Sequence, residues 1–117
     1  MIHTELEVYK KSLLLVKEIY DMTSSYPNSE MWGLALQMRR ASVSIPSNLA
    51  EGCARNSQKE LLNFLNYSLG SLAELETQIE ISCMLKYIKE DVKLVQMQNT
   101  TLIRRMLLNL IKSIKSP

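Results

Sequence analysis

Apolar residues recur at spacings of three and four along most of this 117-residue chain, which is the period of an amphipathic helix. The pattern predicts four helices, over residues 5–22, 30–54, 58–85 and 90–114. The connections between them are short, which favours antiparallel neighbours in space. We therefore expect an all-α protein in which residues 1–117 form a single domain, an antiparallel up-down-up-down four-helix bundle.

Residues that start, stop or bend helices lie at the expected boundaries. Asn28 or Ser29 is placed to cap the second helix, since both are strong N-cap residues. Ser57 and Glu60 have the spacing of a capping box at the start of the third helix. Pro46 lies inside the second helix, where it removes one backbone hydrogen bond, so the sequence predicts a kink there.

Each helix carries a row of apolar residues that we expect to face the core. In the first two helices the rows are Leu6, Tyr9, Leu13, Val16 and Tyr20, followed by Leu34, Met38, Ala41, Ile45 and Leu49. In the last two they are Leu61, Leu65, Leu69, Leu72, Ile79 and Cys83, followed by Val92, Val95, Leu102, Ile103, Met106, Leu110 and Ile114.

Apolar residues outside these rows indicate association between copies of the chain. The second helix has an additional row, and the third helix has apolar residues beyond its main stripe, which is more than three neighbours within one chain need to cover. The candidates for a subunit contact are Leu36, Val43, Ala50, Phe64 and Leu75.

Polar residues also share one face of the second helix, and this row has two interpretations. In an antiparallel pair with the third helix, Arg40 lies opposite Glu74, where we expect an ion pair, and Ser44 lies opposite Gly70. The row would then be a structural network that specifies one packing arrangement. Its members are Gln37, Arg40, Ser44, Asn48, Glu51, Asn63 and Glu74. Alternatively, Arg39, Arg40, Asn48 and Arg55 form a site for an anion or RNA.

The charge distribution says more than the net charge of +2. No acidic residue follows Asp91, so the last helix is basic toward its C-terminal end. Such a helix can follow the phosphates of a nucleic acid, or it can simply favour the helix dipole and solubility. The candidate RNA-binding residues are Arg39, Arg55, Lys59, Arg104, Arg105, Lys112 and Lys115.

Catalytic and metal-binding patterns are missing from the sequence. The only histidine is His3, and none follows a glutamate at the spacing of a di-iron bundle. Cys53 and Cys83 lie outside any metal-ligand spacing. We therefore expect a protein that is not an enzyme, binds no cofactor or metal and has no membrane span, and we expect it to be cytoplasmic.

Two groups of residues form a recognisable signature. Around the second helix they are Pro27, Glu30, Leu34, Gln37, Arg39-Arg40-Ala41, Ser44-Ile45-Pro46-Ser47-Asn48, Ala50-Glu51-Gly52 and Arg55, and in and after the third they are Leu65, Gly70-Ser71-Leu72, Glu74-Leu75-Glu76-Thr77-Gln78, Leu85 and Tyr87. This signature resembles the bacterial four helix bundle protein family, whose founding members are encoded in intervening sequences of large-subunit ribosomal RNA genes.

That resemblance implies assembly into a homopentameric ring and a distant similarity to accessory proteins of diversity-generating retroelements, which are thought to engage RNA and a reverse transcriptase. Two functional hypotheses remain open. The ring is a scaffold that binds RNA through the basic residues named above. Alternatively, it is a protein-interaction hub, or an accessory subunit of a reverse transcriptase or other protein, without direct contact to nucleic acid.

Overall fold

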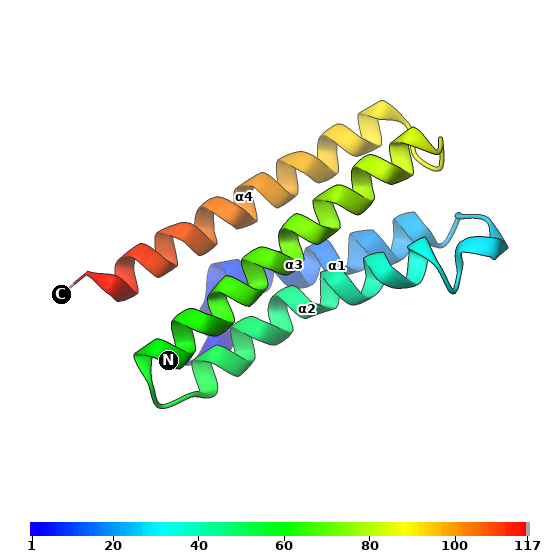
Figure 1. The fold of residues 1–117 in the computed structure, drawn as a ribbon. Coiled ribbons are helices and arrows are strands. Elements are labelled where there is room, and N and C mark those ends of the chain that lie inside the picture. Colours follow the sequence, from blue (N-terminus) through cyan, green and yellow to red (C-terminus); the bar gives the residue numbers. More distant parts are fainter. Residues whose placement is uncertain (117) are drawn as a thin grey trace.

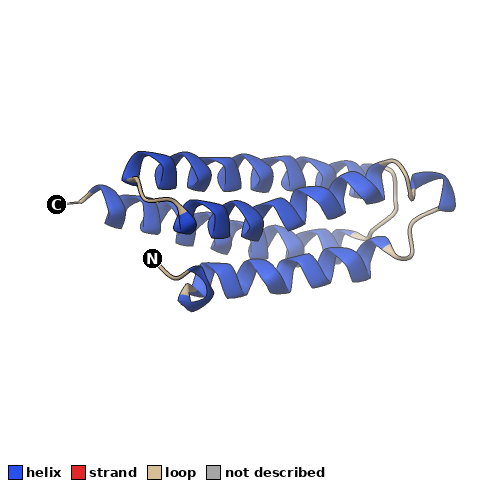
Figure 2. Ribbon diagram, turned by 90° about the horizontal axis from the view of Figure 1, so that it is seen from below, coloured by secondary structure: helices blue, strands red, loops and turns tan. Residues whose placement is uncertain are grey.

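The computed structural model describes residues 1–116 and confirms an all-α four-helix bundle. The long helices are α1 (Glu7–Thr23), α2 (Leu34–Ala54), α3 (Gln58–Met84) and α4 (Glu90–Lys115), with short 3-10 turns η1 (His3–Glu5) and η2 (Asn28–Glu30). The four helices lie side by side along the long axis of a body measuring 48 × 24 × 20 Å (Figures 1 and 2). The predicted helix boundaries therefore hold to within four residues.

Two helix starts differ in how they are capped. Ser57 caps α3 as predicted, because its hydroxyl accepts a hydrogen bond from the Glu60 amide at 3.1 Å. The cap predicted for α2 at Asn28 or Ser29 is wrong, since both residues belong to η2. Instead the Glu30 carboxylate accepts a hydrogen bond of 3.3 Å from the amide of Leu34, the first residue of α2.

The end of α3 forms a Schellman motif with a lysine in the position that usually holds glycine. The Tyr87 amide donates to the Ser82 carbonyl at 2.9 Å, and the Lys86 amide donates to the Cys83 carbonyl at 3.0 Å. Lys86 has φ 64°, so its backbone is left-handed. This turn leads directly into α4.

Helices α2 and α3 pack closely, in a register given by hydroxyl groups on α3. Ser68 donates to the Ile45 carbonyl at 2.9 Å, and Ser71 donates to the Ser44 hydroxyl at 2.8 Å. Gly52 permits the approach near the connecting turn, because a Cβ there would lie 2.9 Å from the Cβ of Phe64. From Ser68 to Ser71 along α3 the hydrogen-bond partner on α2 moves back from Ile45 to Ser44. The two helices therefore run in opposite directions (Figure 1).

The core follows the prediction in α2 and departs from it in α1 and α4. Of the α2 row, Met38, Ala41, Ile45 and Leu49 are buried. In α1 the buried residues are Val8, Ser12, Leu15, Ile19 and Thr23, whereas the predicted Leu13 and Tyr20 are exposed. In α4 they are Gln96, Thr100, Ile103, Leu107 and Ile111, whereas the predicted Val92, Val95 and Leu102 are exposed.

Polar side chains from other helices explain why α4 buries polar residues. The Thr100 hydroxyl donates to the Glu76 carboxylate of α3 at 2.8 Å. The Gln96 amide donates to the Glu18 carboxylate of α1 at 3.4 Å, and Asn99 donates to the same carboxylate at 3.2 Å. With these polar residues turned inward, Val92, Val95 and Leu102 of α4 are left on the surface.

Helix α2 runs without interruption through Pro46, and the kink expected there stays a prediction. No helix among residues 1–116 combines the length and apolar character that a membrane span requires.

Candidate nucleic-acid interface

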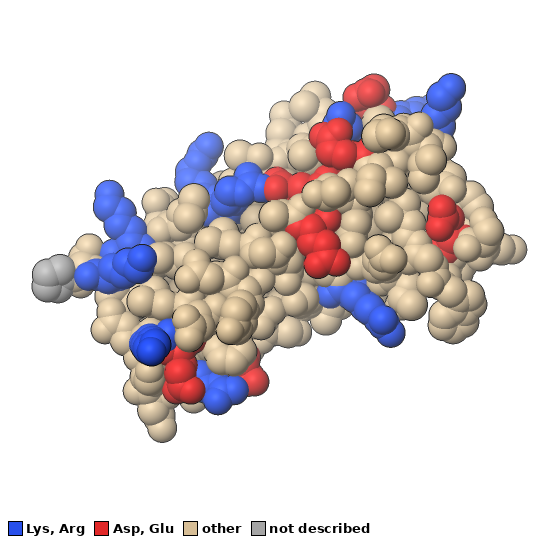
Figure 3. Space-filling model, in the orientation of Figure 1, with Lys and Arg blue, Asp and Glu red and all other residues tan. Residues whose placement is uncertain are grey.

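Basic side chains from separate helices gather at one end of the bundle. The Gln58 side-chain amide donates a 2.8 Å hydrogen bond to the Ile114 carbonyl, which joins the start of α3 to the end of α4. This contact brings Lys59 to the same end as Lys112 and Lys115. In Figure 3 several basic side chains lie toward the end that carries the C-terminus, with some acidic side chains among them, and further basic and acidic side chains lie over the middle and at the opposite end.

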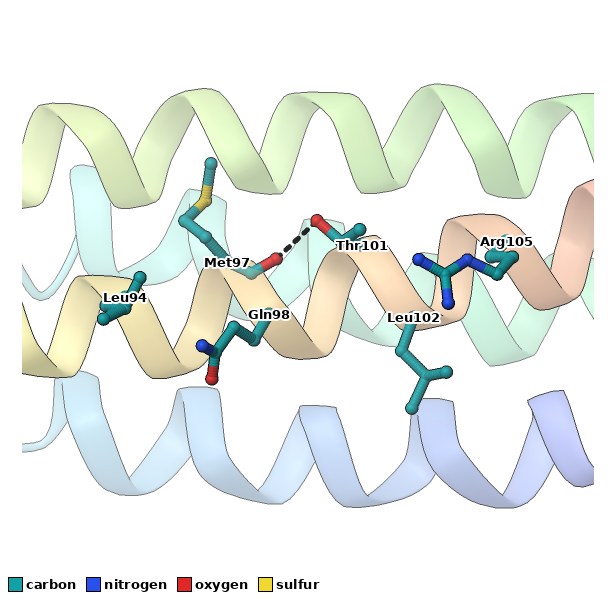
Figure 4. A pocket seen from close by; sticks show the side chains of 6 residues that line it. All are labelled: Leu94, Met97, Gln98, Thr101, Leu102 and Arg105. Atoms are coloured by element: carbon teal, nitrogen blue, oxygen red, sulfur yellow. Dashed lines mark hydrogen bonds between the residues drawn. The ribbon is translucent and has the colours of Figure 1, made fainter.

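Four of the predicted RNA-binding residues are exposed and take part in no ion pair within residues 1–116; they are Lys59, Arg105, Lys112 and Lys115. Arg105 lies on the outer face of α4, where it borders an open groove of about 400 Å³ (Figure 4). Exposed cations without a partner are available to neutralise phosphate groups.

Arg55 is exposed at the same end but has partners. Its guanidinium lies 3.2 Å from the Glu51 carboxylate and 3.9 Å from that of Glu60. It also lies over the Phe64 ring, 4.9 Å from the centroid. Exposed ion pairs of this kind are weak, so a phosphate can compete for Arg55.

Two other predicted RNA-binding arginines are held by structural contacts. Arg39 donates to the Thr23 hydroxyl at 2.9 Å and lies 4.7 Å above the Tyr20 ring, so it joins α2 to the end of α1. Arg104 pairs with Glu76, whose side chain is only 15% exposed. Both partners are distant in sequence, which is why the sequence alone did not separate these arginines from the exposed cations.

The predicted polar network forms in part. Asn48 donates to both the carbonyl and the hydroxyl of Ser44 at 2.9 Å, and Ser71 joins them from α3. The ion pair expected between Arg40 and Glu74 is not formed: both side chains are exposed, and neither has an ion-pair partner within residues 1–116. Glu74 instead accepts a bond of 3.2 Å from Gln78.

The remaining members of that network lie at the surface. Gln37 and Asn63 are exposed, and the side chain of Glu51 pairs with Arg55, the residue directly after α2, rather than across to α3. The network is therefore a short bridge of Ser44, Asn48 and Ser71 rather than a buried row along the whole helix pair.

The residues predicted to contact another subunit fall into two groups. Val43 is 39% exposed and Ala50 is half-buried, and both line a groove of about 230 Å³ between α1 and α2 together with Leu13. Leu36 and Phe64 are also half-buried. Leu75 was predicted wrongly, because it has no exposed surface and lies in the core of this chain.

Neither cysteine is positioned for metal binding or nucleophilic chemistry. Both are free thiols, and burial raises the pKa of Cys53 and of Cys83. The Glu90 carboxylate raises the pKa of Cys83 further, so both thiols are less readily ionised than an ordinary cysteine. Within residues 1–116, no three His, Cys, Asp or Glu side chains are grouped to hold a metal ion.

The chain is a small four-helix bundle, and the exposed cations Lys59, Lys112 and Lys115 lie at the end where α3 begins and α4 ends. Residues 4–109 match the family described as "23S rRNA-intervening sequence protein", and the chain belongs to this family. No curated protein gives a significant match.

One solved structure with a similar fold comes from Bacteroides thetaiotaomicron VPI-5482, a protein of unknown function from the S23 ribosomal protein family. The two chains are 25% identical with a TM-score of 0.80, over 90% of this chain and 98% of the other. The likeness therefore extends over nearly all of both proteins.

Proposed function

We propose that this protein is a non-catalytic, cytoplasmic scaffold that assembles into a ring, most simply a homopentamer, and binds RNA through the basic end of each bundle. The observation that carries the proposal is that Lys59, Lys112 and Lys115 lie at the same end of the bundle, where the Gln58–Ile114 hydrogen bond joins the start of α3 to the end of α4. Three cations from two helices at one end present a local positive field although the chain's net charge is only +2.

The composition of α4 supports contact with phosphates rather than bases. No acidic residue follows Asp91, and the unpaired Arg105 lies on the same helix. Lysine and arginine on an exposed helix surface bind phosphate without reading sequence. The proposed contact set is therefore Lys59, Arg105, Lys112 and Lys115, with Arg55 available at the edge, whereas Arg39 and Arg104 are excluded by their structural contacts.

Assembly is supported by apolar surface that this chain does not cover. Leu13 and Val43 face the groove between α1 and α2, and Leu94 and Leu108 are about half exposed on α4. A ring requires two different complementary patches on each subunit, and the chain offers apolar surface on two sides. The number five comes from the family resemblance and not from these faces.

The test is the salt dependence of binding to a single-stranded RNA of roughly 12 nucleotides. Each neutralised phosphate contributes about −0.7 to the slope of log affinity against log salt. The triple variant Lys59→Ala, Arg105→Ala, Lys112→Ala should flatten that slope by about two. A matched triple variant at the other end, Lys17→Ala, Lys86→Ala, Lys89→Ala, should leave it unchanged. Equal effects of the two variants, or no binding at low salt, would refute the proposal.

The alternative, a protein-interaction hub or an accessory subunit of a reverse transcriptase, has a specific observation in its favour. Trp32 is 87% exposed in the connection before α2, and Met84 is 78% exposed at the end of α3. Exposed aromatic and methionine side chains are typical of protein contacts. If the wild-type chain binds no RNA, the surface around Trp32 and Met84 is the first to test for protein binding. Capture of a partner protein by the wild type and by Trp32→Ala would then be compared.

A further inference from the structure

We propose that the groove between α2 and α3 beside the basic end is a binding site for one unpaired nucleobase that carries an exocyclic amino group. The groove has a volume of about 600 Å³ and is lined by Ser44, Ser47, Asn48, Ala50, Glu51 and Phe64. The inference rests on the RNA-binding function proposed above and adds base contacts to the phosphate contacts.

Tyr67 does not itself line the groove but lies beside Phe64, the one residue of α3 that does. Phe64 lines the groove and meets Tyr67 in an edge-to-face contact, with ring centroids 5.4 Å apart and planes at 84°. Such a contact covers at most one face of Tyr67. Tyr67 is 56% exposed, so part of its ring is open to a stacked base. Stacking on a tyrosine accepts any base, since every base has a π-face.

The polar lining of the groove is rich in acceptors. The Asn48 amide nitrogen donates twice to Ser44, and within residues 1–116 the Asn48 Oδ1 accepts no hydrogen bond. One carboxylate oxygen of Glu51 pairs with Arg55, and the other accepts no hydrogen bond within residues 1–116. A base amino group donates two hydrogens to such oxygens, whereas uracil has no amino group. The site therefore favours cytosine, adenine or guanine over uracil.

The position of the groove fits a strand that continues onto the basic end. Lys59 and Tyr67 are both exposed on α3, eight residues apart, or about 12 Å along the helix. Arg55 lies over Phe64 at the same wall, where it can meet the phosphate that follows the stacked base. The Glu51 carboxylate disfavours phosphate inside the groove, which leaves the groove to the base and the cations to the backbone.

Three RNA probes of roughly 12 nucleotides separate base contacts from phosphate contacts: oligo(C), oligo(U) and an abasic strand. Tyr67→Ala should weaken oligo(C) binding by about fivefold or more and leave the abasic strand unaffected. Tyr67→Phe should retain binding, because the ring is kept. Asn63→Ala, one turn away on exposed α3 surface, is the matched control and should change neither affinity.

The preference for an amino-bearing base has its own readout. Wild-type protein should bind oligo(C) more tightly than oligo(U), and Glu51→Gln should reduce that ratio, whatever it does to both affinities through the lost charge. Helical content and mass by light scattering should match the wild type in every variant.

The outcomes distinguish this inference from the function on which it rests. If Tyr67→Ala leaves oligo(C) binding unchanged while binding stays salt-dependent, the base site is wrong and the phosphate scaffold stands. If the wild type binds none of the three probes, both proposals fail. If Tyr67→Ala or Glu51→Gln changes the mass of the assembly, a second copy of the chain covers the groove and the base site is refuted.

Discussion

The Tyr87 hydroxyl donates a hydrogen bond of 2.8 Å to the Glu30 carboxylate, and so connects the α3–α4 turn to the segment that precedes α2. The other oxygen of the same carboxylate accepts from the Leu34 amide. Glu30 therefore has two roles, since it satisfies one free amide at the start of α2 and holds the opposite connection in place. Tyr87 also packs against the buried Tyr26, with ring centroids 5.2 Å apart.

Removing this hydroxyl should destabilise the bundle in a pH-dependent way. The bond to Glu30 raises the pKa of Tyr87 above its ordinary value of 10.0. A group whose pKa is raised on folding contributes its full stability below the unfolded pKa, and that contribution declines as the pH rises from there through the folded pKa. Tyr87→Phe should lower Tm at neutral pH and flatten the fall of Tm above about pH 10.

The control for this prediction is Tyr67→Phe, because the Tyr67 hydroxyl makes no hydrogen bond within residues 1–116. Thermal unfolding of the three proteins between neutral pH and pH near 11 is the measurement. Identical pH profiles for the wild type and Tyr87→Phe would show that the Glu30 bond does not form in solution.

Adjacent arginines on α4 should separate stability from RNA binding. Arg104 pairs with Glu76, and their side chains are 35% and 15% exposed. Arg104→Ala should therefore cost about 1–3 kcal/mol, between the values for surface and buried pairs. Arg105 is exposed and without an ion-pair partner, so Arg105→Ala should change stability by less than about 0.5 kcal/mol while reducing the salt slope of RNA binding. Urea unfolding decides it, and equal costs for the two variants would contradict the assignment.

Two glycines in helices should respond in opposite directions to a methyl group. At Gly52 a Cβ would lie 2.9 Å from the Cβ of Phe64 and 3.3 Å from the Leu61 carbonyl oxygen. Overpacking of this kind costs about 1–3 kcal/mol, which outweighs a gain of about 1 kcal/mol in helix propensity. At Gly70 nothing lies within 4 Å, so Gly70→Ala should stabilise the monomer by up to about 1 kcal/mol.

Denaturant midpoints of the two variants test this contrast, and mass measurement adds information about assembly. If Gly70→Ala instead destabilises the protein and shifts the assembly toward monomer, another copy approaches that face of α3. A gain in stability for Gly52→Ala would show that α2 and α3 can move apart near their turn at no cost in the free energy of unfolding.

The helix pattern could be predicted because it depends on local spacing and on caps such as Ser57, which act within a few residues. The orientation of α4 could not, because the polar residues that it buries have their hydrogen-bond acceptors, Glu18 and Glu76, on other helices. A hydrophobic pattern places valine inside and threonine outside, and here Thr100 is fully buried while Val95 is 49% exposed. Buried polar groups with partners overturn that pattern, and the partners are invisible in a linear sequence.

The candidate site shows the same limit. The basic residues were found from charge alone, since no acidic residue follows Asp91. The charge pattern could not show that Arg39 donates to Thr23 or that Arg104 pairs with Glu76, because each of these contacts joins two helices. The subunit contact predicted for Phe64 stays a prediction: the structure shows only that Phe64 lines a groove beside Tyr67 and Arg55.

Lys86 should be replaceable by glycine with a gain in stability. Its φ of 64° is a left-handed conformation that costs a residue with a Cβ about 1–2 kcal/mol. Glycine removes this cost but adds freedom to the unfolded chain, so Lys86→Gly should stabilise the protein by roughly 0.5–1 kcal/mol. Lys86→Ala is the control: it removes the same side chain but keeps a Cβ at the left-handed position, so it should not stabilise the protein comparably. A loss of stability in Lys86→Gly would mean that the lysine side chain makes a contact that outweighs its backbone strain.

The groove between α1 and α2 should be a contact between copies of the chain. Val43 is 39% exposed and Leu13 is 45% exposed, and both line the groove. Charging the groove with Val43→Lys should shift a particle of several chains toward the 13.4 kDa monomer, because an unpaired charge is costly in a buried contact. Lys11→Glu, an exposed change on α1 outside the groove, is the control and should leave the mass unchanged.

Light scattering at micromolar concentration measures the mass of both variants. A wild-type mass of one chain would refute association, and a dimer or tetramer would refute only the pentamer. An unchanged mass for Val43→Lys would move the contact to the exposed leucines of α4.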